Sequence, residues 1–94
     1  MPEPISRAAR PRLASKARLR YDRKADRYML LYPEKGLALN ATAADIVRLC
    51  TGEHSVGQMV EQLAAKYAQD APAIERQIIE LLGALAERSL VEMT

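Results

Sequence analysis

Apolar and polar residues alternate along one segment of the chain and then give way to a helical spacing. The alternation runs over residues 17–22 and has the period of a half-buried strand. Residues 27–32 form a second apolar run, and residues 36–39 form a short third one. The intervening segment 33–36, Pro-Glu-Lys-Gly, is typical of a reverse turn in which proline fixes φ early and Gly36 can take a positive φ late. The pattern predicts three antiparallel strands.

Helical spacing begins after the third strand. Asn40 or Thr42 can cap a first short helix, and Gly52 suits the left-handed position at its carboxyl end. Ser55 and Gln58 have the spacing of a capping box at the start of a second helix. Each helix carries one apolar stripe at the spacing i, i+3, i+4, i+7, so we expect each to bury one face.

A third helix is predicted from residues 70–72 onward, with Pro72 near its first helical position. Residues 89–93 form a short extended end that can pack back on the sheet. The pattern as a whole predicts an α+β fold that is winged helix-turn-helix-like, with a three-stranded antiparallel sheet followed by three helices. The apolar stripe of the third helix consists of Ile74, Ile78, Leu81, Leu82 and Leu85.

The length of 94 residues fits one small domain, but the two ends of the chain differ in charge. Residues 1–15 contain three prolines and no period, so we expect a flexible basic arm ahead of a single winged-helix-like domain over residues 16–94. Residues 1–24 hold eight Lys or Arg against two acids, a net charge of +6, whereas residues 25–94 hold six against ten, a net charge of −4. The arm could be a solvated tail, attract an acidic peptide, contact nucleic acid or tether a second copy.

The sequence carries little that could perform catalysis. One cysteine, Cys50, and one histidine, His54, cannot supply the four ligands of a structural zinc site. Cys50 falls on the apolar stripe of the first helix, where a small buried thiol is expected. His54 lies in a turn beside Glu53 and Ser55, and adjacent turn residues seldom converge on one substrate atom. No glycine-rich phosphate loop is present, so we expect a protein that is not an enzyme and has no cofactor or metal.

Signals for membrane insertion or export are also lacking in the sequence. No apolar run approaches the roughly 20 residues of a membrane span, and the amino-terminal segment lacks the apolar centre of a secretory signal. A single cysteine cannot form an internal disulfide. We therefore expect a protein of the reducing cytoplasm with no membrane partner.

Four blocks of the sequence stand in a familiar order and spacing: LRYD at 19–22, RYMLLYPEKGLALN at 27–40, TAADIVRLCTG at 42–52 and LLGALAERSLV at 81–91. Over residues 17–92 the chain thereby resembles the PqqD family of pyrroloquinoline quinone biosynthesis. The resemblance implies a non-catalytic peptide chaperone that captures the precursor peptide PqqA. It also implies presentation of that peptide to PqqE, a radical S-adenosylmethionine enzyme that cross-links a glutamate and a tyrosine of PqqA. Related domains recognise leader peptides in other peptide-modifying pathways.

The resemblance also implies where the peptide binds. In the family the peptide adds beside the third strand and lies in a groove against the third helix. Exposed strand edges offer unpaired N–H and C=O groups to such a peptide. We expect Ile79 to be the most telling residue, because it lies off the main stripe and toward the groove. The corresponding residues are Lys35 in the turn, Gly36, Leu37, Ala38 and Leu39 on the strand, and Ile74, Ile78, Ile79 and Leu82 on the helix. Ordinary core packing is the alternative role for Leu37, Leu39, Ile78 and Leu82.

A small winged-helix DNA-binding regulator is the alternative function, because such a fold often carries a basic arm. Against it, the third helix presents Glu75 and Glu80 with only Arg76 between them, and acids there would repel phosphates. We therefore expect no nucleic-acid partner. An exposed strand edge and a charge-complementary arm are compatible with a homodimer, so the oligomeric state stays open.

Overall fold

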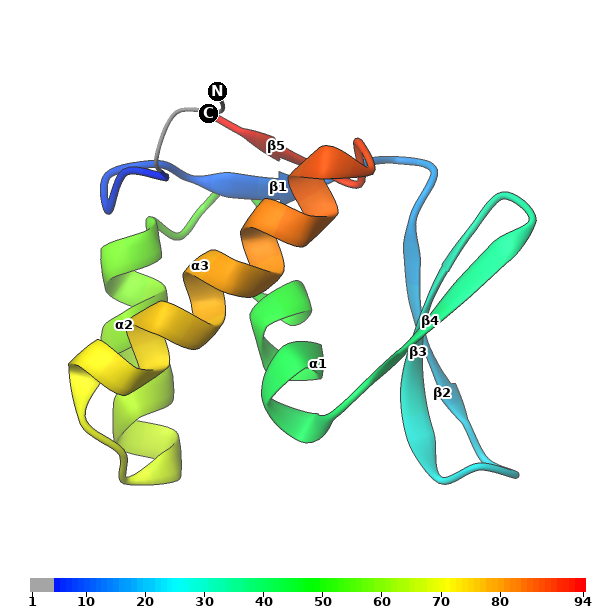
Figure 1. The fold of residues 1–94 in the computed structure, drawn as a ribbon, viewed down its shortest axis with the longest axis horizontal. Coiled ribbons are helices and arrows are strands. Elements are labelled where there is room, and N and C mark those ends of the chain that lie inside the picture. The colour runs from blue at the N-terminus through cyan, green and yellow to red at the C-terminus, as the bar shows by residue number, and fades with distance from the viewer. Residues whose placement is uncertain (1–4) are drawn as a thin grey trace.

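Three antiparallel strands lead into three helices, and a second, smaller sheet joins the two ends of the fold. The computed structural model describes residues 5–94. Figure 1 shows the three helices on one side of the three-stranded sheet. The predicted α+β, winged helix-turn-helix-like architecture is confirmed. The elements in chain order are β1 (Pro11–Leu13), β2 (Arg18–Asp22), β3 (Arg27–Tyr32), β4 (Lys35–Leu39), α1 (Ala41–Arg48), α2 (Val56–Tyr67), α3 (Ala71–Glu87) and β5 (Val91–Met93).

The larger sheet has the strand order β2-β3-β4, so β3 is central and pairs antiparallel on both sides. Only Pro33 and Glu34 connect β3 to β4, which makes the turn shorter than the sequence pattern suggests. The positive φ of this turn falls on Glu34 (66°), and Gly36 already belongs to β4. The prediction of a positive φ at Gly36 was therefore wrong, because strand pairing already begins with Tyr32 and Lys35.

The helices begin at the predicted caps. The side chain of Asn40 accepts a hydrogen bond of 2.7 Å from a backbone N–H in the first turn of α1. Ser55 and Gln58 form the capping box of α2. Gly52 has a left-handed backbone (φ 83°), but α1 has already ended before it. Its N–H donates to the Pro11 carbonyl (2.9 Å), so this glycine shapes the connection that passes β1.

The amino-terminal segment differs from the prediction of a flexible arm over residues 1–15. Its last part forms β1, which pairs antiparallel with β5 at the other end of the chain. Pro11 is buried, and the N–H of Leu13 donates to the Cys50 carbonyl (2.9 Å). A strand of three residues is too short to show an alternating pattern, which is why the sequence did not reveal it. The folded unit therefore begins before residue 16, and residues 1–4 lie outside the described residues.

One apolar core joins the three-stranded sheet to the helices. Leu30 of β3 and Leu39 of β4 are buried in it together with Ile46 of α1 and Met59 of α2. The predicted stripe of α3 also faces this core, with Leu81 only half-buried at its border. Among residues 5–94, no helix is both long enough and apolar enough to cross a membrane.

Candidate functional site

Strand β4 has a free edge, because within the described residues only β3 pairs with it. A two-residue turn closes on a hydrogen-bonded pair, and antiparallel pairs then alternate between bonded and non-bonded ones. Lys35, Leu37 and Leu39 therefore direct their backbone groups toward β3. The N–H and C=O groups of Gly36 and Ala38 point away from the sheet, where an extended chain could pair with both residues.

A groove of about 330 Å³ opens where β4 ends. It lies between the first turns of α1 and the middle of α3, and Figure 1 shows β4 running directly into α1. The half-buried Ala43 and Leu81 contribute apolar surface, and the exposed Gln77 and Glu80 contribute polar groups. The groove thus begins at the end of the strand that carries the free edge. The lining residues are Asn40, Thr42, Ala43, Ile46, Gln77, Glu80 and Leu81.

The strand residues predicted to bind peptide are mostly accessible. Lys35, Gly36 and Ala38 are exposed, and Leu37 is half-buried. Leu39 is only 6% exposed and belongs to the core. Its side chain therefore lacks the free surface that contact with a peptide would need, and core packing, the alternative considered for it, is what the structure shows.

The helix residues predicted to bind peptide lie mainly in the core. Ile74, Ile78 and Leu82 are each at most 1% exposed. Ile78 and Leu82 thus pack in the core, which was the alternative role considered for them from the sequence. These three side chains set the position of α3 and offer no surface to a ligand in this structure.

Ile79 is half-buried, but it lies on the wrong flank of α3. At about 100° per residue, it is turned roughly 160° away from both Gln77 and Leu81, which line the groove. Glu75, one turn before Ile79, forms an ion pair with Arg7 (3.3 Å), so this flank faces the amino-terminal segment. The prediction that Ile79 points toward the groove was wrong.

Three residues of α3 that line the groove are absent from the predicted site. Leu81 was assigned to the buried stripe, although it stands at the border of that stripe, and Gln77 lies one turn before it on the same flank. Glu80 was interpreted only as a charge. The helical spacing of Gln77 and Leu81 is the signal that could have identified this flank, once the side of α3 that faces β4 was known.

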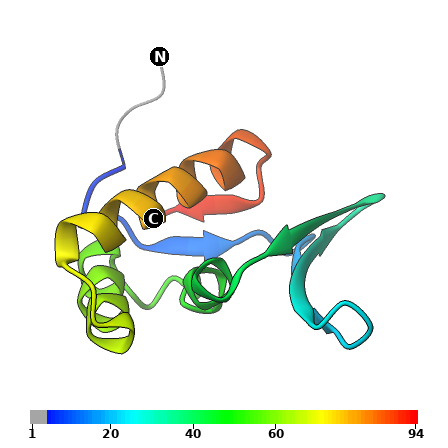
Figure 2. The same ribbon diagram turned by 60° about the horizontal axis from the view of Figure 1, so that its bottom comes forward.

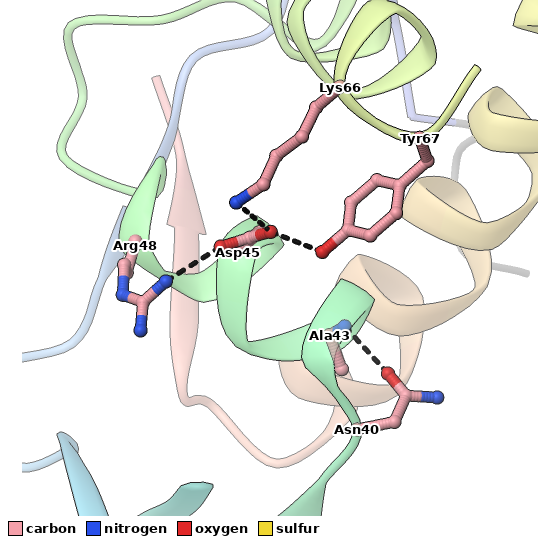
Figure 3. A network of polar contacts seen from close by, with 6 residues as sticks. All are labelled: Asn40, Ala43, Asp45, Arg48, Lys66 and Tyr67. Carbon is pink, nitrogen blue, oxygen red and sulfur yellow. Dashed lines mark hydrogen bonds and ion pairs between the residues drawn. The ribbon is translucent and has the colours of Figure 1, made fainter. Parts of the chain in front are cut away.

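A charged cluster joins α1 to α2 behind the groove (Figure 3). Asp45 is 7% exposed and accepts hydrogen bonds from Arg48 Nη1 (2.7 Å), Lys66 Nζ (2.8 Å) and the Tyr67 hydroxyl. Burial acts to raise the pKa of Asp45, but the bonds from Lys66 and Tyr67 outweigh it and hold this pKa below its ordinary value. The bond to Asp45 in turn raises the pKa of Lys66 and that of Tyr67. The cluster fixes the position of α1, whose first turns line the groove.

The most reactive side chains of the chain are not arranged for catalysis. Cys50 is buried, its thiol donates to the Ile46 carbonyl (3.2 Å), and burial raises its pKa to about 12, so the nucleophilic thiolate is scarce at neutral pH. His54 Nδ1 lies 3.5 Å from the Gln62 amide. In the part of the chain that the structure describes, no three His, Cys, Asp or Glu side chains come together as a metal site. The site is suited to binding backbone and apolar groups.

Comparison with known proteins gives consistent matches over most of the chain. The family model described as coenzyme PQQ synthesis protein D (PqqD) matches residues 27–91. A protein of Bradyrhizobium diazoefficiens named PqqA binding protein is 40% identical over 87 residues, covering 93% of this chain and 84% of that protein. A protein of the same name from Xanthomonas oryzae pv. oryzae is 35% identical over 89 residues, covering 95% and 97%.

Two solved structures have the same fold and clear sequence similarity. One is the solution NMR structure of the PqqD truncation of Methylobacterium extorquens PqqCD, described as a functional, stand-alone recognition element for ribosomally synthesized and post-translationally modified peptides. It is 31% identical with a TM-score of 0.81 and covers 94% of each chain. The crystal structure of PqqD from Xanthomonas campestris is 36% identical with a TM-score of 0.58, covering 92% of this chain and 96% of that one.

Proposed function

This chain belongs to the PqqD family, and from that premise we propose that it is a non-catalytic peptide chaperone of pyrroloquinoline quinone biosynthesis. It binds the precursor peptide PqqA and presents it to the radical S-adenosylmethionine enzyme PqqE. The relatives named PqqA binding protein support the peptide partner, and the recognition-element description of the Methylobacterium structure supports a binding role. We place this activity in the cytoplasm, where a lone buried thiol such as Cys50 stays reduced.

The observation that carries the proposal is the free edge of β4 beside the groove. PqqA adds to the sheet as a further strand, and its backbone pairs with the outward N–H and C=O groups of Gly36 and Ala38. Every second side chain of the added strand turns toward the helices, where Ala43 and Leu81 offer apolar contact. Lys35, exposed at the start of β4, attracts acidic residues of the peptide.

Presentation to an enzyme requires that the peptide be released again. A dissociation constant of about 1 μM, equivalent to about −8 kcal/mol, fits a short interface dominated by backbone pairing. Binding at that strength holds the peptide at cellular concentrations and still allows its transfer. This chain makes and breaks no covalent bond in the process.

The proposal is tested by measuring the cross-linking of PqqA by purified PqqE with and without this chain. We expect the reaction to depend on the chain at concentrations near its dissociation constant for PqqA, determined separately with fluorescently labelled peptide. The variant Ala38→Pro, which removes one outward N–H, is expected to support less cross-linking than Ala38→Ser, which keeps it. Absence of PqqA binding, or cross-linking at the same rate without the chain, would refute the proposed function.

A further inference from the structure

The face of the three-stranded sheet that points away from the helices has an unusual composition. We call it the outer sheet face and define it by six residues in two cross-strand rows. Figures 1 and 2 show the helices on the opposite side of the sheet, with no helix of the described residues covering this one. The rows are Arg18, Leu31 and Gly36, and next to them Arg20, Met29 and Ala38.

The centre of the outer sheet face is apolar and half-open to solvent. Met29 and Leu31 are both half-buried, yet neither packs against the hydrophobic core. They lean over Gly36, where an added Cβ would lie 3.2 Å from a terminal carbon of each. Because Gly36 and Ala38 have little or no side chain, they do not cover Met29 and Leu31. These two apolar side chains therefore stay accessible beside the free edge.

Cations surround this apolar centre on the β2 side. A depression of about 650 Å³, roughly twice the volume of the groove at α3, is lined by Arg20, Arg23, Lys24, Met29 and Leu31 together with Tyr21 and Asp22. The Asp22 carboxylate already accepts the backbone N–H of Lys24 (3.0 Å). The acid in this lining is thus engaged in shaping the turn between β2 and β3.

The cations on this face and in the adjoining turn between β2 and β3 lack acidic partners in the described structure. Among residues 5–94, neither Arg18 nor Arg20 forms an ion pair, and the same holds for Arg23 and Lys24. Like charges gathered on one surface repel each other, and a partner with carboxylates would relieve that repulsion. Phosphates of a nucleic acid would match the charge but would leave Met29 and Leu31 without an apolar counterpart, which favours a protein surface.

The outer sheet face is continuous with the proposed peptide strand. Side chains directly opposite each other in neighbouring strands lie on the same face of a sheet. Peptide residues that pair with Gly36 and Ala38 would therefore present their side chains on the outer sheet face, next to Leu31 and Met29. A protein bound there would touch the chaperone and the captured peptide at once.

We propose that the outer sheet face docks the enzyme that receives the peptide, through an acidic surface of that enzyme with apolar side chains at its centre. The inference rests on the proposed function, because this enzyme is the one that acts on the peptide held at β4. It assigns different groups to the two partners: the backbone edge of β4 and the groove at α3 bind peptide, and the side chains of the outer sheet face bind enzyme. Docking next to the peptide places the peptide's outward side chains within reach of the enzyme.

The test measures binding of two probes, labelled PqqA and purified PqqE, to the same set of variants. Arg20→Glu combined with Arg23→Glu is expected to weaken PqqE binding by about tenfold or more and to change PqqA affinity by less than about threefold. Met29→Ser is a second variant, which removes apolar contact without changing charge. It should also weaken PqqE binding and leave PqqA binding unchanged. The control combines Arg76→Glu on α3 with Arg88→Glu just after it, two exposed positions away from the outer sheet face. This control makes the same change in net charge and should leave PqqE binding unchanged.

Each result of this experiment distinguishes the inference from the proposed function. If PqqA fails to bind the unaltered chain, the proposed function is wrong. If PqqA binds but PqqE does not, or if PqqE binds all variants equally well, the docking face is wrong and the peptide chaperone stands. Salt-sensitive binding of random duplex DNA that the Arg20 and Arg23 changes abolish would overturn the inference in favour of a nucleic-acid surface. Self-association of the chain through this face, seen by sedimentation and lost in the same variants, would overturn it in favour of a second copy.

Discussion

Asp45 illustrates how a single charged residue positions a groove that it does not line. Its carboxylate accepts hydrogen bonds from α1 and from two residues of α2, and within the described residues no buried polar side-chain atom lacks a partner. A buried carboxylate is costly unless such partners are present. The cluster therefore fixes α1 against α2 and, through α1, one wall of the groove.

Asp45→Asn should lower the free energy of unfolding by about 2 kcal/mol, because bonds to a charged acceptor become bonds to a neutral amide and one donor loses its partner. Urea unfolding followed by circular dichroism measures this difference. Asp70→Asn is the matched control, since Asp70 precedes α3 but makes no side-chain cap bond. Equal stability of the two variants would show that the Asp45 cluster contributes nothing.

The same cluster gives stability a defined pH dependence. Because the pKa of Asp45 is lowered in the folded protein, its contribution is complete above its ordinary pKa of 3.8 and is lost as the pH falls through the lower, folded value. Unfolding measured at steps from pH 6 to pH 3 should show a decline in stability that is shallower in Asp45→Asn. A decline of the same size in both proteins would assign it to other carboxylates.

Leu81 and Ile79 offer a direct comparison between the two flanks of α3. Both are half-buried, but only Leu81 lines the groove. Leu81→Ala should weaken PqqA binding by about threefold to tenfold, in keeping with the loss of an apolar contact, whereas Ile79→Ala should leave it within about twofold. Fluorescence titration of labelled peptide measures both. The reverse order would restore Ile79 to the binding site and place the peptide on the other flank.

Strand β4 has one edge paired with β3 and one edge that no strand of the described residues pairs with. Its pairing with β3 was predictable, because two apolar runs separated by a proline-containing turn favour a hairpin. Its free edge follows from the strand order. The side of α3 that borders the groove was not predictable, since the spacing of α3 identifies the buried stripe but not which flank of it lies toward β4. The sequence therefore placed Leu81 in the buried stripe and Ile79 on the groove flank, whereas Leu81 is the one that lines the groove in the structure.

Ala38→Pro tests the edge of β4 without breaking the hairpin. The N–H of Ala38 points away from β3, so proline there removes a donor from the free edge, where strands tolerate it. We expect PqqA binding to weaken by about tenfold or more, through loss of at least one backbone bond and a steric block to pairing. Ala38→Ser should bind like the unaltered chain. Unchanged binding by Ala38→Pro, with the fold intact by circular dichroism, would argue against strand addition at this edge.

The small sheet of β1 and β5 joins the two ends of the chain. Arg10 and Thr94 exchange backbone hydrogen bonds (2.9 and 3.1 Å), and Arg12 forms a bridge with Thr51. The sequence did not predict this second sheet, because each strand has only three residues and their pairing spans most of the chain. A pattern along the sequence carries no information about such a distant partner.

Removal of residues 1–13 should therefore destabilise the whole fold and not merely delete an arm. We expect the free energy of unfolding to fall by at least about 2 kcal/mol, because several backbone hydrogen bonds are lost and Val91 and Cys50 become exposed. Reaction of Cys50 with a thiol reagent should become faster in the shortened chain. A shortened chain with the same stability and an unreactive Cys50 would show that β1 is dispensable.

If PqqA becomes a strand beside β4, amide hydrogen exchange followed by NMR should detect the added strand at individual residues. The Gly36 and Ala38 amides point to solvent in the free chain, whereas the Leu37 amide points to β3. On addition of PqqA, we expect amide exchange to slow at Gly36 and Ala38 and to change little at Leu37. Saturating peptide that leaves the Gly36 and Ala38 amides in fast exchange would contradict strand addition at this edge.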